Sequence, residues 1–153
     1  MKRNGRAGMG DPECIFCRIV SGEIPAKVIM QNELAVALLD AFPLAVGHSL
    51  VTTRSHRSKV QDLKSEETIA LFEMTKKIAA AVEAAMQAAA TTIAIHNGRE
   101  AGQEIPHVHV HVIPRRRGDG AGPVHSMFKN RPKLSPQEFD SVHGKITASL
   151  AKH

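Results

Sequence analysis

The sequence is poor in aromatic residues. Its 153 residues include no tryptophan, no tyrosine and five phenylalanines. Because proteins that bind single-stranded nucleic acids stack bases on aromatic rings, this scarcity argues against a nucleic-acid partner. A net charge of +5 suits phosphate-bearing ligands, but by itself it indicates only solubility and a weak attraction to anions.

Long apolar runs are also missing. No segment approaches the roughly 20 apolar residues that cross a bilayer, and no apolar segment follows the basic, glycine-rich start of the chain. We therefore expect a cytoplasmic protein that does not enter a membrane. Residues 1–12 are predicted to form a disordered tail and residues 13–153 a single domain, because a chain of this length suits one compact core.

Cysteine is scarce as well, and the two cysteines, Cys14 and Cys17, form a C-x-x-C pair. A thioredoxin-like redox couple would open a helix after a strand in a βαβ unit, and the surrounding sequence lacks that context. A disulfide is disfavoured in a chain without a secretory signal. The spacing supplies half of the ligands of a tetrahedral zinc site, which is the interpretation we favour; two imidazoles would complete it.

Hydrophobic periodicity predicts an α+β fold. A long helix is expected over residues 65–90, with Ser65 as its N-cap, and a C-terminal helix over residues 135–153, with Ser135 as its cap. Strand-like segments are residues 34–40, 48–54, 91–97 and 107–113, whereas residues 14–20 fit either a helical turn or a strand. The expected architecture is an antiparallel sheet with one long helix packed on it.

Three histidines alternate with valines in the segment HVHVHV, residues 107–112. Side chains two positions apart in a strand share a face, so the valines would point into a core. His107, His109 and His111 would then line the other face, roughly 6.5 Å apart. Polar residues are common on the solvent-exposed face of a strand. Histidine is an uncommon residue, however, so three histidines on the same face favour a functional role.

Two kinds of chemistry suit such a row. Imidazoles on alternate strand positions can share a zinc, copper or nickel ion. Alternatively, a neutral imidazole can attack phosphorus and then act as a leaving group, while flanking imidazoles donate hydrogen bonds to the phosphoryl oxygens. The row alone does not decide between these two.

The neighbouring motifs resemble the histidine triad (HIT) superfamily, and in particular its zinc-bearing bacterial-type hydrolases. The matching stretches are CIFCRIVSGEIPAK (14–27), GHSLV (47–51) and AGQEIPHVHVHVIPR (101–115), which together span two thirds of the chain. The resemblance implies a nucleotide hydrolase or transferase that passes a nucleoside monophosphate through its central histidine. The expected substrate is a nucleoside phosphoramidate or a dinucleoside polyphosphate, and the alternative is a nucleotide-sensing module with slow or vestigial catalysis.

The resemblance also implies roles for individual residues. His109 would be the nucleophile, with His48 beside it and His111 as a phosphate donor. A uridylyltransferase branch of the family has glutamine at the position of His111, so histidine there favours hydrolysis. The substrate-binding positions implied are Asp40 for the ribose hydroxyls, Ile15, Phe16 and Ile19 for a purine base, and His96, Asn97 and Gln103 for the sugar and phosphate.

Three further expectations follow from the resemblance. A structural zinc ion would be held by Cys14, Cys17, His56 and His107. A homodimer would join two sheets across the long helix and a strand edge. Finally, Glu104 replaces a small hydroxyl residue of some branches, and its carboxylate predicts an amine-bearing leaving group in preference to a polyphosphate tail.

Overall fold

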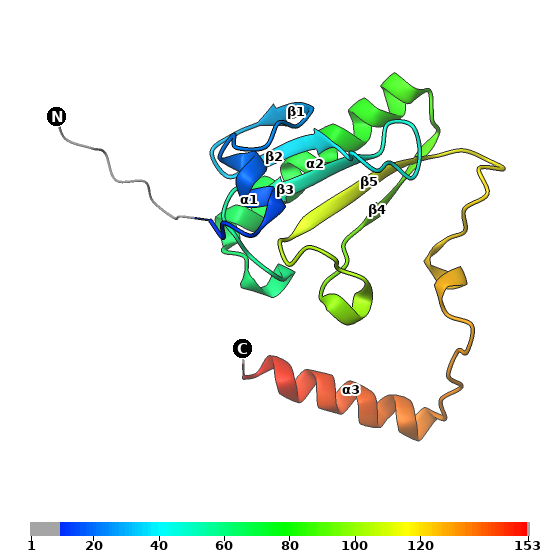
Figure 1. The fold of residues 1–153 in the computed structure, drawn as a ribbon. Helices are drawn as coiled ribbons and strands as arrows, with labels where there is room; N and C mark the ends of the chain where they lie inside the picture. Colours follow the sequence, from blue (N-terminus) through cyan, green and yellow to red (C-terminus); the bar gives the residue numbers. More distant parts are fainter. Residues whose placement is uncertain (1–9, 153) are drawn as a thin grey trace. The chain divides into compact units, whose positions relative to one another are not determined.

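The computed structural model describes residues 10–152, which contain one five-stranded antiparallel sheet in the order β1-β2-β3-β5-β4 (Figure 1). The strands are β1 (Val28–Gln31), β2 (Ala35–Leu39), β3 (Ser49–Thr53), β4 (Ala90–Ala94) and β5 (His109–Arg115). The helices are α1 (Ile15–Val20), α2 (Ser65–Met86) and α3 (Pro136–Leu150), with 3-10 turns at Val60–Asp62, Arg99–Ala101 and Val124–Met127. The predicted α+β fold with an antiparallel sheet is confirmed.

The chain divides into two compact units, the first ending at Asp119 and the second beginning at Gly120. The sheet, α1 and α2 belong to the first unit, and α3 belongs to the second. Whether residues 13–153 behave as the single domain that the sequence predicts is not decided by this division, and it stays a prediction. Of the predicted tail, residues 1–9 lie outside the described part of the chain. None of the helices in residues 10–152 has the length and hydropathy of a membrane span.

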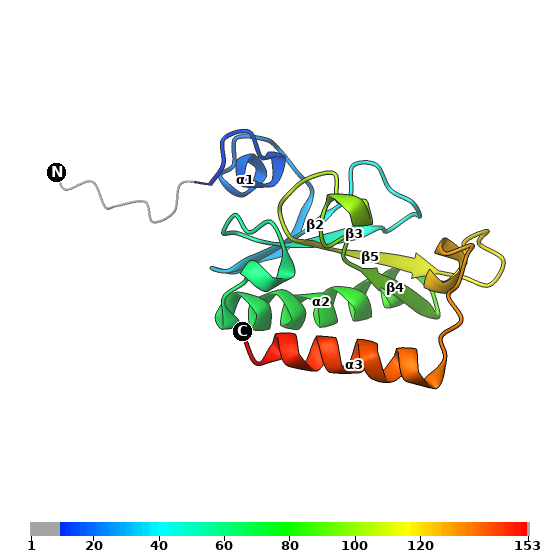
Figure 2. The ribbon, with the colours of Figure 1, turned by 90° about the horizontal axis from the view of Figure 1, so that it is seen from below.

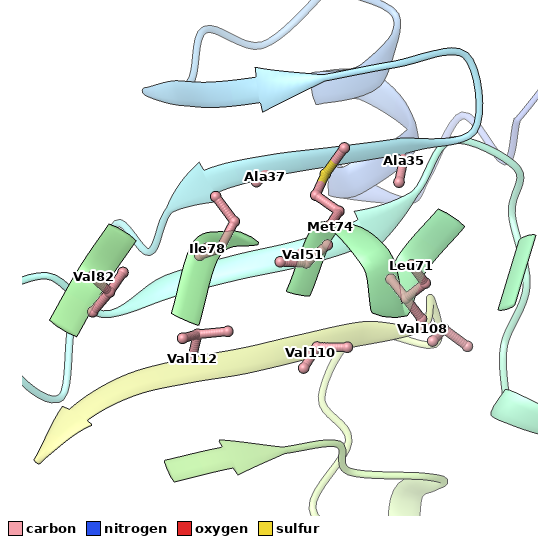
Figure 3. Packing of buried hydrophobic residues seen from close by; sticks show 10 residues of the cluster. All are labelled: Ala35, Ala37, Val51, Leu71, Met74, Ile78, Val82, Val108, Val110 and Val112. Carbon is pink, nitrogen blue, oxygen red and sulfur yellow. The ribbon is translucent and has the colours of Figure 1, made fainter. Parts of the chain in front are cut away.

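The main core lies between α2 and one face of the sheet (Figures 2 and 3). Strand alternation sends every second side chain to this face, and the helical period places one stripe of α2 against it. Each aliphatic side chain buried here contributes about 1.5–3 kcal/mol of hydrophobic free energy. The buried residues are Ala35, Ala37, Val51, Leu71, Met74, Ile78, Val82, Val108, Val110 and Val112.

On the opposite face of the sheet, α1 packs over part of β2 and β3 (Figure 2). The segment that fitted either a helical turn or a strand is thus helical. Phe16 and Cys17 are buried on one side of α1, where they pack with Val36, Leu38 and Leu50 of β2 and β3. A helix of six residues is too short to be stable alone, so this packing is what holds it.

Element ends differ from the predicted ones by a few residues. The N-cap of α2 is Lys64 and not Ser65, because the carboxylate of Glu67 accepts the Lys64 N–H at 2.8 Å and takes over the capping. The helix ends at Met86, four residues early, where Gln87 adopts a left-handed conformation with φ 52°. This reversal lets β4 begin at Ala90 and pair with β5.

In the second unit, the predicted cap of α3 is confirmed. The Ser135 hydroxyl accepts the Glu138 N–H at 3.2 Å, and the Glu138 carboxylate accepts the Ser135 N–H at 2.7 Å. Two otherwise unpaired backbone donors are thereby satisfied. The helix ends at Leu150, three residues before the predicted end.

An ion pair between Arg57 and Glu67 ties α2 to the segment that follows β3. Arg57 Nε and Nη2 donate to the Glu67 carboxylate at 3.0 and 3.1 Å, and the Glu67 side chain is 4% exposed. The carbonyl of Arg57 accepts the Val108 N–H at 2.7 Å, at the entrance to β5. The pair therefore supports the strand that carries the histidine row.

Replacing Glu67 with glutamine is expected to lower the free energy of unfolding by about 1–3 kcal/mol at neutral pH, since Arg57 loses its charged partner. Urea denaturation measures the change. Glu73→Gln is the matched control, because Glu73 forms an exposed pair with Lys76 that contributes less than about 1 kcal/mol.

The effect of Glu67→Gln depends on pH. Hydrogen bonds from Arg57 hold the pKa of Glu67 below its ordinary value of 4.5, so the folded state binds fewer protons at this carboxyl than the unfolded state. The stabilisation is complete above that ordinary value and is lost as the pH falls through the folded pKa. The difference between wild type and Glu67→Gln should shrink in acid, and a difference that stayed constant would contradict this assignment.

Candidate functional site

The histidine row occupies the sheet face opposite α2, as the alternation predicts. In β5, His109 pairs with Thr52 and His111 with Leu50, both on β3. The ring centroids of His109 and His111 are 5.0 Å apart, and the ring of Phe16 from α1 lies 4.8 Å from that of His109. His107 and His109 are therefore buried between the sheet and α1, and His111 is half-buried beside them, so the row is not an ordinary solvated strand face.

Four predicted metal ligands come together at the start of this row. Cys14 Sγ lies 3.4 Å from His107 Nδ1, and Cys17 Sγ lies 3.3 Å from His56 Nδ1 and 3.6 Å from His107 Nδ1. Bond lengths of about 2.3 Å to sulfur and 2.0 Å to nitrogen place the ligand atoms of tetrahedral zinc roughly 3.3–3.8 Å apart. The spacing of these four side chains thus fits a tetrahedral metal ion.

The protonation pattern of the cluster also suits a cation. His107 Nε2 donates to the Thr53 carbonyl at 2.8 Å, which leaves the lone pair of Nδ1 facing the two sulfur atoms. Burial raises the pKa of Cys17 to about 11, so a thiolate there requires a compensating positive charge. Both cysteines are free of disulfides in the structure.

His109 is held in one tautomer by the backbone. Its Nδ1–H donates to the carbonyl oxygen of His107 at 2.7 Å, so the lone pair of the neutral ring is on Nε2. The side chain is 9% exposed, and burial lowers the pKa of His109 below its ordinary value of 6.5. A neutral imidazole with a free Nε2 lone pair is the nucleophilic form of this residue.

His48 and His111 form a hydrogen-bonded chain with a defined direction. The Leu44 N–H donates to His48 Nδ1 at 3.1 Å, so His48 Nε2 carries the proton and donates to His111 Nδ1 at 2.9 Å. The ring proton of neutral His111 must then be on Nε2. Burial lowers the pKa of both rings, that of His111 to about 4, so both are neutral at physiological pH. His111 can therefore donate one N–H to a ligand.

Asp40 lies directly after β2, beside this chain. Its Oδ1 accepts the Phe42 N–H at 2.8 Å, and its Oδ2 lies 3.5 Å from His48 Nε2. The carboxylate lines two adjoining clefts, one containing the histidines and one that is mostly apolar. It is thus available to a ligand that reaches from one cleft into the other.

The histidine cleft has a volume of about 280 Å³ and is lined by His48, His96, His109 and His111 together with Asp40 and Phe16. The apolar cleft has a volume of about 610 Å³ and contains the predicted base wall of Ile15, Phe16 and Ile19. Phe16, Asp40, Phe42, Leu50 and Ile105 line both clefts. The two clefts are therefore continuous and differ in polarity.

Two predicted substrate-binding residues have other partners. Asn97 Oδ1 accepts the Val60 N–H at 2.8 Å, and Gln103 Nε2 donates to the Ser58 carbonyl at 2.8 Å. Neither residue lines the histidine cleft. Asn97 and Gln103 therefore fasten a loop to the segment after β3, whereas His96 does line the cleft, with its ring 5.4 Å from that of His111.

The sequence prediction missed part of the cleft wall. Phe42 and Leu44, which are 87% and 76% exposed, line the histidine cleft from the loop between β2 and β3. The available signal was two large apolar residues in a short proline-containing loop between Asp40 and His48. Exposed apolar side chains gathered beside a polar cleft are typical of a binding site.

Comparison with known proteins adds family information to this geometry. Residues 21–118 match the family model described as HIT domain. An uncharacterized HIT-like protein of Methanocaldococcus jannaschii is 40% identical over 107 residues, which cover 70% of this chain and 82% of that protein. An adenosine 5'-monophosphoramidase of Schizosaccharomyces pombe is 31% identical over 140 residues, which cover 90% of this chain and 98% of that protein.

Solved structures agree with the fold. A HIT family member from Bacillus subtilis matches with a TM-score of 0.80 and 31% identity, over 89% of this chain and 96% of that chain. A Zn-bound histidine triad family protein from Mycobacterium smegmatis matches with a TM-score of 0.68 and 30% identity, over 90% of this chain and 97% of that chain.

Gly47, immediately before His48, should tolerate no side chain. Its φ is +96°, and a Cβ there would lie 2.5 Å from Met86 Cγ. Gly47→Ala is therefore expected to lower the free energy of unfolding by about 1–3 kcal/mol, as measured by urea denaturation. Gly22→Ala is the control, because Gly22 has φ +81° but no atom within 4 Å of the added Cβ. Equal losses for the two variants would show that the contact with Met86 contributes nothing.

Proposed function

Because this chain belongs to the histidine triad family, we propose that it is a nucleotide hydrolase that releases a nucleoside monophosphate through a covalent intermediate on His109. The substrate is a nucleoside phosphoramidate or a dinucleoside polyphosphate. The observation that carries the proposal is the hydrogen bond of 2.7 Å from His109 Nδ1 to the His107 carbonyl, because it leaves the Nε2 lone pair free for attack.

In the first step, the lone pair of His109 Nε2 attacks the α-phosphorus. The new N–P bond forms as the bond from phosphorus to the leaving group breaks, and its electron pair departs with the leaving group. When the leaving group is an amine, its nitrogen takes up a proton from the solvent as it departs. The positive charge that develops on the His109 ring is stabilised by the His107 carbonyl at Nδ1–H. The Nε2–H of His111, oriented by His48, donates to a phosphoryl oxygen.

In the second step, water attacks the same phosphorus from the side that the leaving group has vacated. The N–P bond breaks, its electron pair returns to Nε2, the attacking water loses a proton to the solvent, and the nucleoside monophosphate is released. Splitting one displacement into two in this way is useful because a neutral imidazole is both a good nucleophile and a good leaving group. The purine base occupies the apolar cleft against Ile15, Phe16 and Ile19. The carboxylate of Asp40 accepts hydrogen bonds from the ribose hydroxyls.

We also propose that Cys14, Cys17, His56 and His107 hold a structural zinc ion. Distances of 3.3–3.6 Å between their ligand atoms and the Zn-bound relative from Mycobacterium smegmatis support this. When bound, the ion supplies a rigid crosslink between the N-terminal segment and the start of β5. The reaction itself uses only the chain's own imidazoles.

A homodimer and a cytoplasmic location remain parts of the proposal. The open edge of β4 supports the former, because Ile93 on this edge strand is 49% exposed. An edge strand with exposed apolar residues can associate with a second copy of the chain.

His109→Gln is expected to lower the turnover of adenosine 5'-phosphoramidate by roughly 10³-fold or more while preserving the binding of adenosine monophosphate. Turnover is measured by release of the monophosphate, and binding by calorimetry. His143→Gln, a substitution on an exposed face of α3, is the control and should retain full activity. Steady turnover by His109→Gln would refute the assignment. If mass spectrometry detects no covalent adduct on the wild-type protein, the nucleotide-sensing alternative is favoured.

Zinc removal should destabilise the protein without altering the chemistry directly. A ligand present at a thousand times its dissociation constant contributes about 4 kcal/mol, equivalent to roughly 8–16 °C in Tm for a chain of this size. Wild-type protein is expected to contain one zinc ion per chain by native mass spectrometry and to lose this Tm increment with a chelator. Cys17→Ser should show the lower Tm with or without chelator. A chelator that removed the ion but left Tm unchanged would contradict a structural role.

A further inference from the structure

A third cleft, with a volume of about 720 Å³, adjoins the histidine cleft. Glu104 and Gly102 line both of them. No described residue lines both this third cleft and the apolar cleft. The histidine cleft therefore adjoins the apolar cleft through one set of residues and the third cleft through another. Lys59 and Arg99 line the third cleft, which we call the polar cleft.

The walls of the polar cleft are fastened to each other by three hydrogen bonds. Segment 58–61 contributes Ser58 and Lys59 to one wall, and the loop 97–103 contributes Gly98, Arg99, Gly102 and Gln103 to the other. The Val60 N–H donates to Asn97 Oδ1 at 2.8 Å, Asn97 Nδ2 donates to Gln61 Oε1 at 3.0 Å, and Gln103 Nε2 donates to the Ser58 carbonyl at 2.8 Å. These bonds flank Lys59 on both sides along the chain, so the backbone that carries its side chain is held in place.

Lys59 lies directly against the loop. Gly98 has φ +116°, and a Cβ at this position would lie 3.2 Å from Lys59 Cε and 3.5 Å from Nζ. The absence of a side chain at Gly98 thus lets the ammonium group approach the loop backbone, with the guanidinium-bearing Arg99 as the next residue. The polar cleft therefore combines two cations with one carboxylate, that of Glu104, at its junction with the histidine cleft.

We propose that Lys59 and Arg99 form the leaving-group subsite and select leaving groups that carry a negative charge beyond the atom bonded to phosphorus. The inference rests on the proposed function: with the base in the apolar cleft and the α-phosphorus at His109, the remaining part of the substrate extends into the polar cleft. Glu104 lines both the histidine cleft and the polar cleft, so in this proposal its carboxylate accepts a hydrogen bond from the bridging N–H. The cations act farther out, on the charged end of the departing group.

Two adenosine 5'-phosphoramidates test the proposal, one made from β-alanine and one from β-alaninamide. They share the bridging nitrogen and chain length and differ only in whether the distal group is charged. One charge pair at about 4 Å in water changes an equilibrium or rate roughly fivefold, so two cations should give wild type about a tenfold or greater preference in kcat/KM for the carboxylate. The double substitution Lys59→Gln with Arg99→Gln should reduce this preference to about one.

The control variant has the same net charge as the Lys59 and Arg99 double variant, but its substitutions lie outside the polar cleft. Lys76→Gln with Lys77→Gln removes two positive charges from exposed positions of α2 and should retain the wild-type preference. Loss of the preference in this control would show a general attraction to a basic protein, and the subsite would be wrong. An equal loss of kcat/KM for both phosphoramidates in the Lys59 and Arg99 variant would also overturn the proposal, because it would indicate a structural role.

Binding separates this proposal from the catalytic one. In the His109→Gln background, calorimetry measures the affinity for both phosphoramidates without turnover, and the carboxylate should bind about tenfold more tightly only when Lys59 and Arg99 are present. This result would stand even if His109 were not the nucleophile. Diadenosine tetraphosphate, measured in the same way, distinguishes a phosphate chain from a carboxylate as the selected anion. The subsite would be disproved if the substitutions at Lys59 and Arg99 lowered the affinity for neither the β-alanine phosphoramidate nor diadenosine tetraphosphate.

Discussion

The site depends on His107, which is bonded in three directions. Its Nδ1 faces the sulfur atoms of Cys14 and Cys17, its Nε2 donates to the Thr53 carbonyl, and its own carbonyl accepts the Nδ1–H of His109. The side chain therefore belongs to the candidate metal cluster, while the backbone fixes the tautomer of the candidate nucleophile. A single residue thus connects the order of the N-terminal segment to the chemical form of the reactive ring.

Burial is the main reason why the imidazoles of the histidine cleft are neutral. Desolvation lowers the pKa of His48, His109 and His111, and the neighbouring imidazoles lower the pKa of His109 and His111 further because they would repel a second positive charge. Neutral rings each have one donor and one acceptor, so they can form a directed chain that starts at the Leu44 N–H. A cluster of charged imidazoles would have only donors and could not be ordered in this way.

The sequence predicts the two faces of β5 and the four-residue metal cluster well, because both depend on local spacing and on motifs that the resemblance places. The sequence does not predict the intramolecular partners of Asn97 and Gln103, because an amide can bond to a phosphate or to a backbone group equally well. These partners depend on where segment 58–61 lies. Gln103 also lines the polar cleft, and the substrate-binding roles of both residues stay a prediction. Similarly, the short segment around Phe16 has no periodicity of its own. Its helical form follows from packing against β2 and β3, which are distant in the chain.

The two faces of β5 carry different side chains, and this limits which changes in sequence the strand can accept. Its valines fill the core against α2, and its histidines line the cleft. Because the side-chain period of a strand is two, deleting or inserting one residue would exchange the two sets, forcing imidazoles into an apolar core and valines into the cleft. Changes in length in this part of the chain are therefore confined to the connections on either side, and the strand itself can evolve only by substitution.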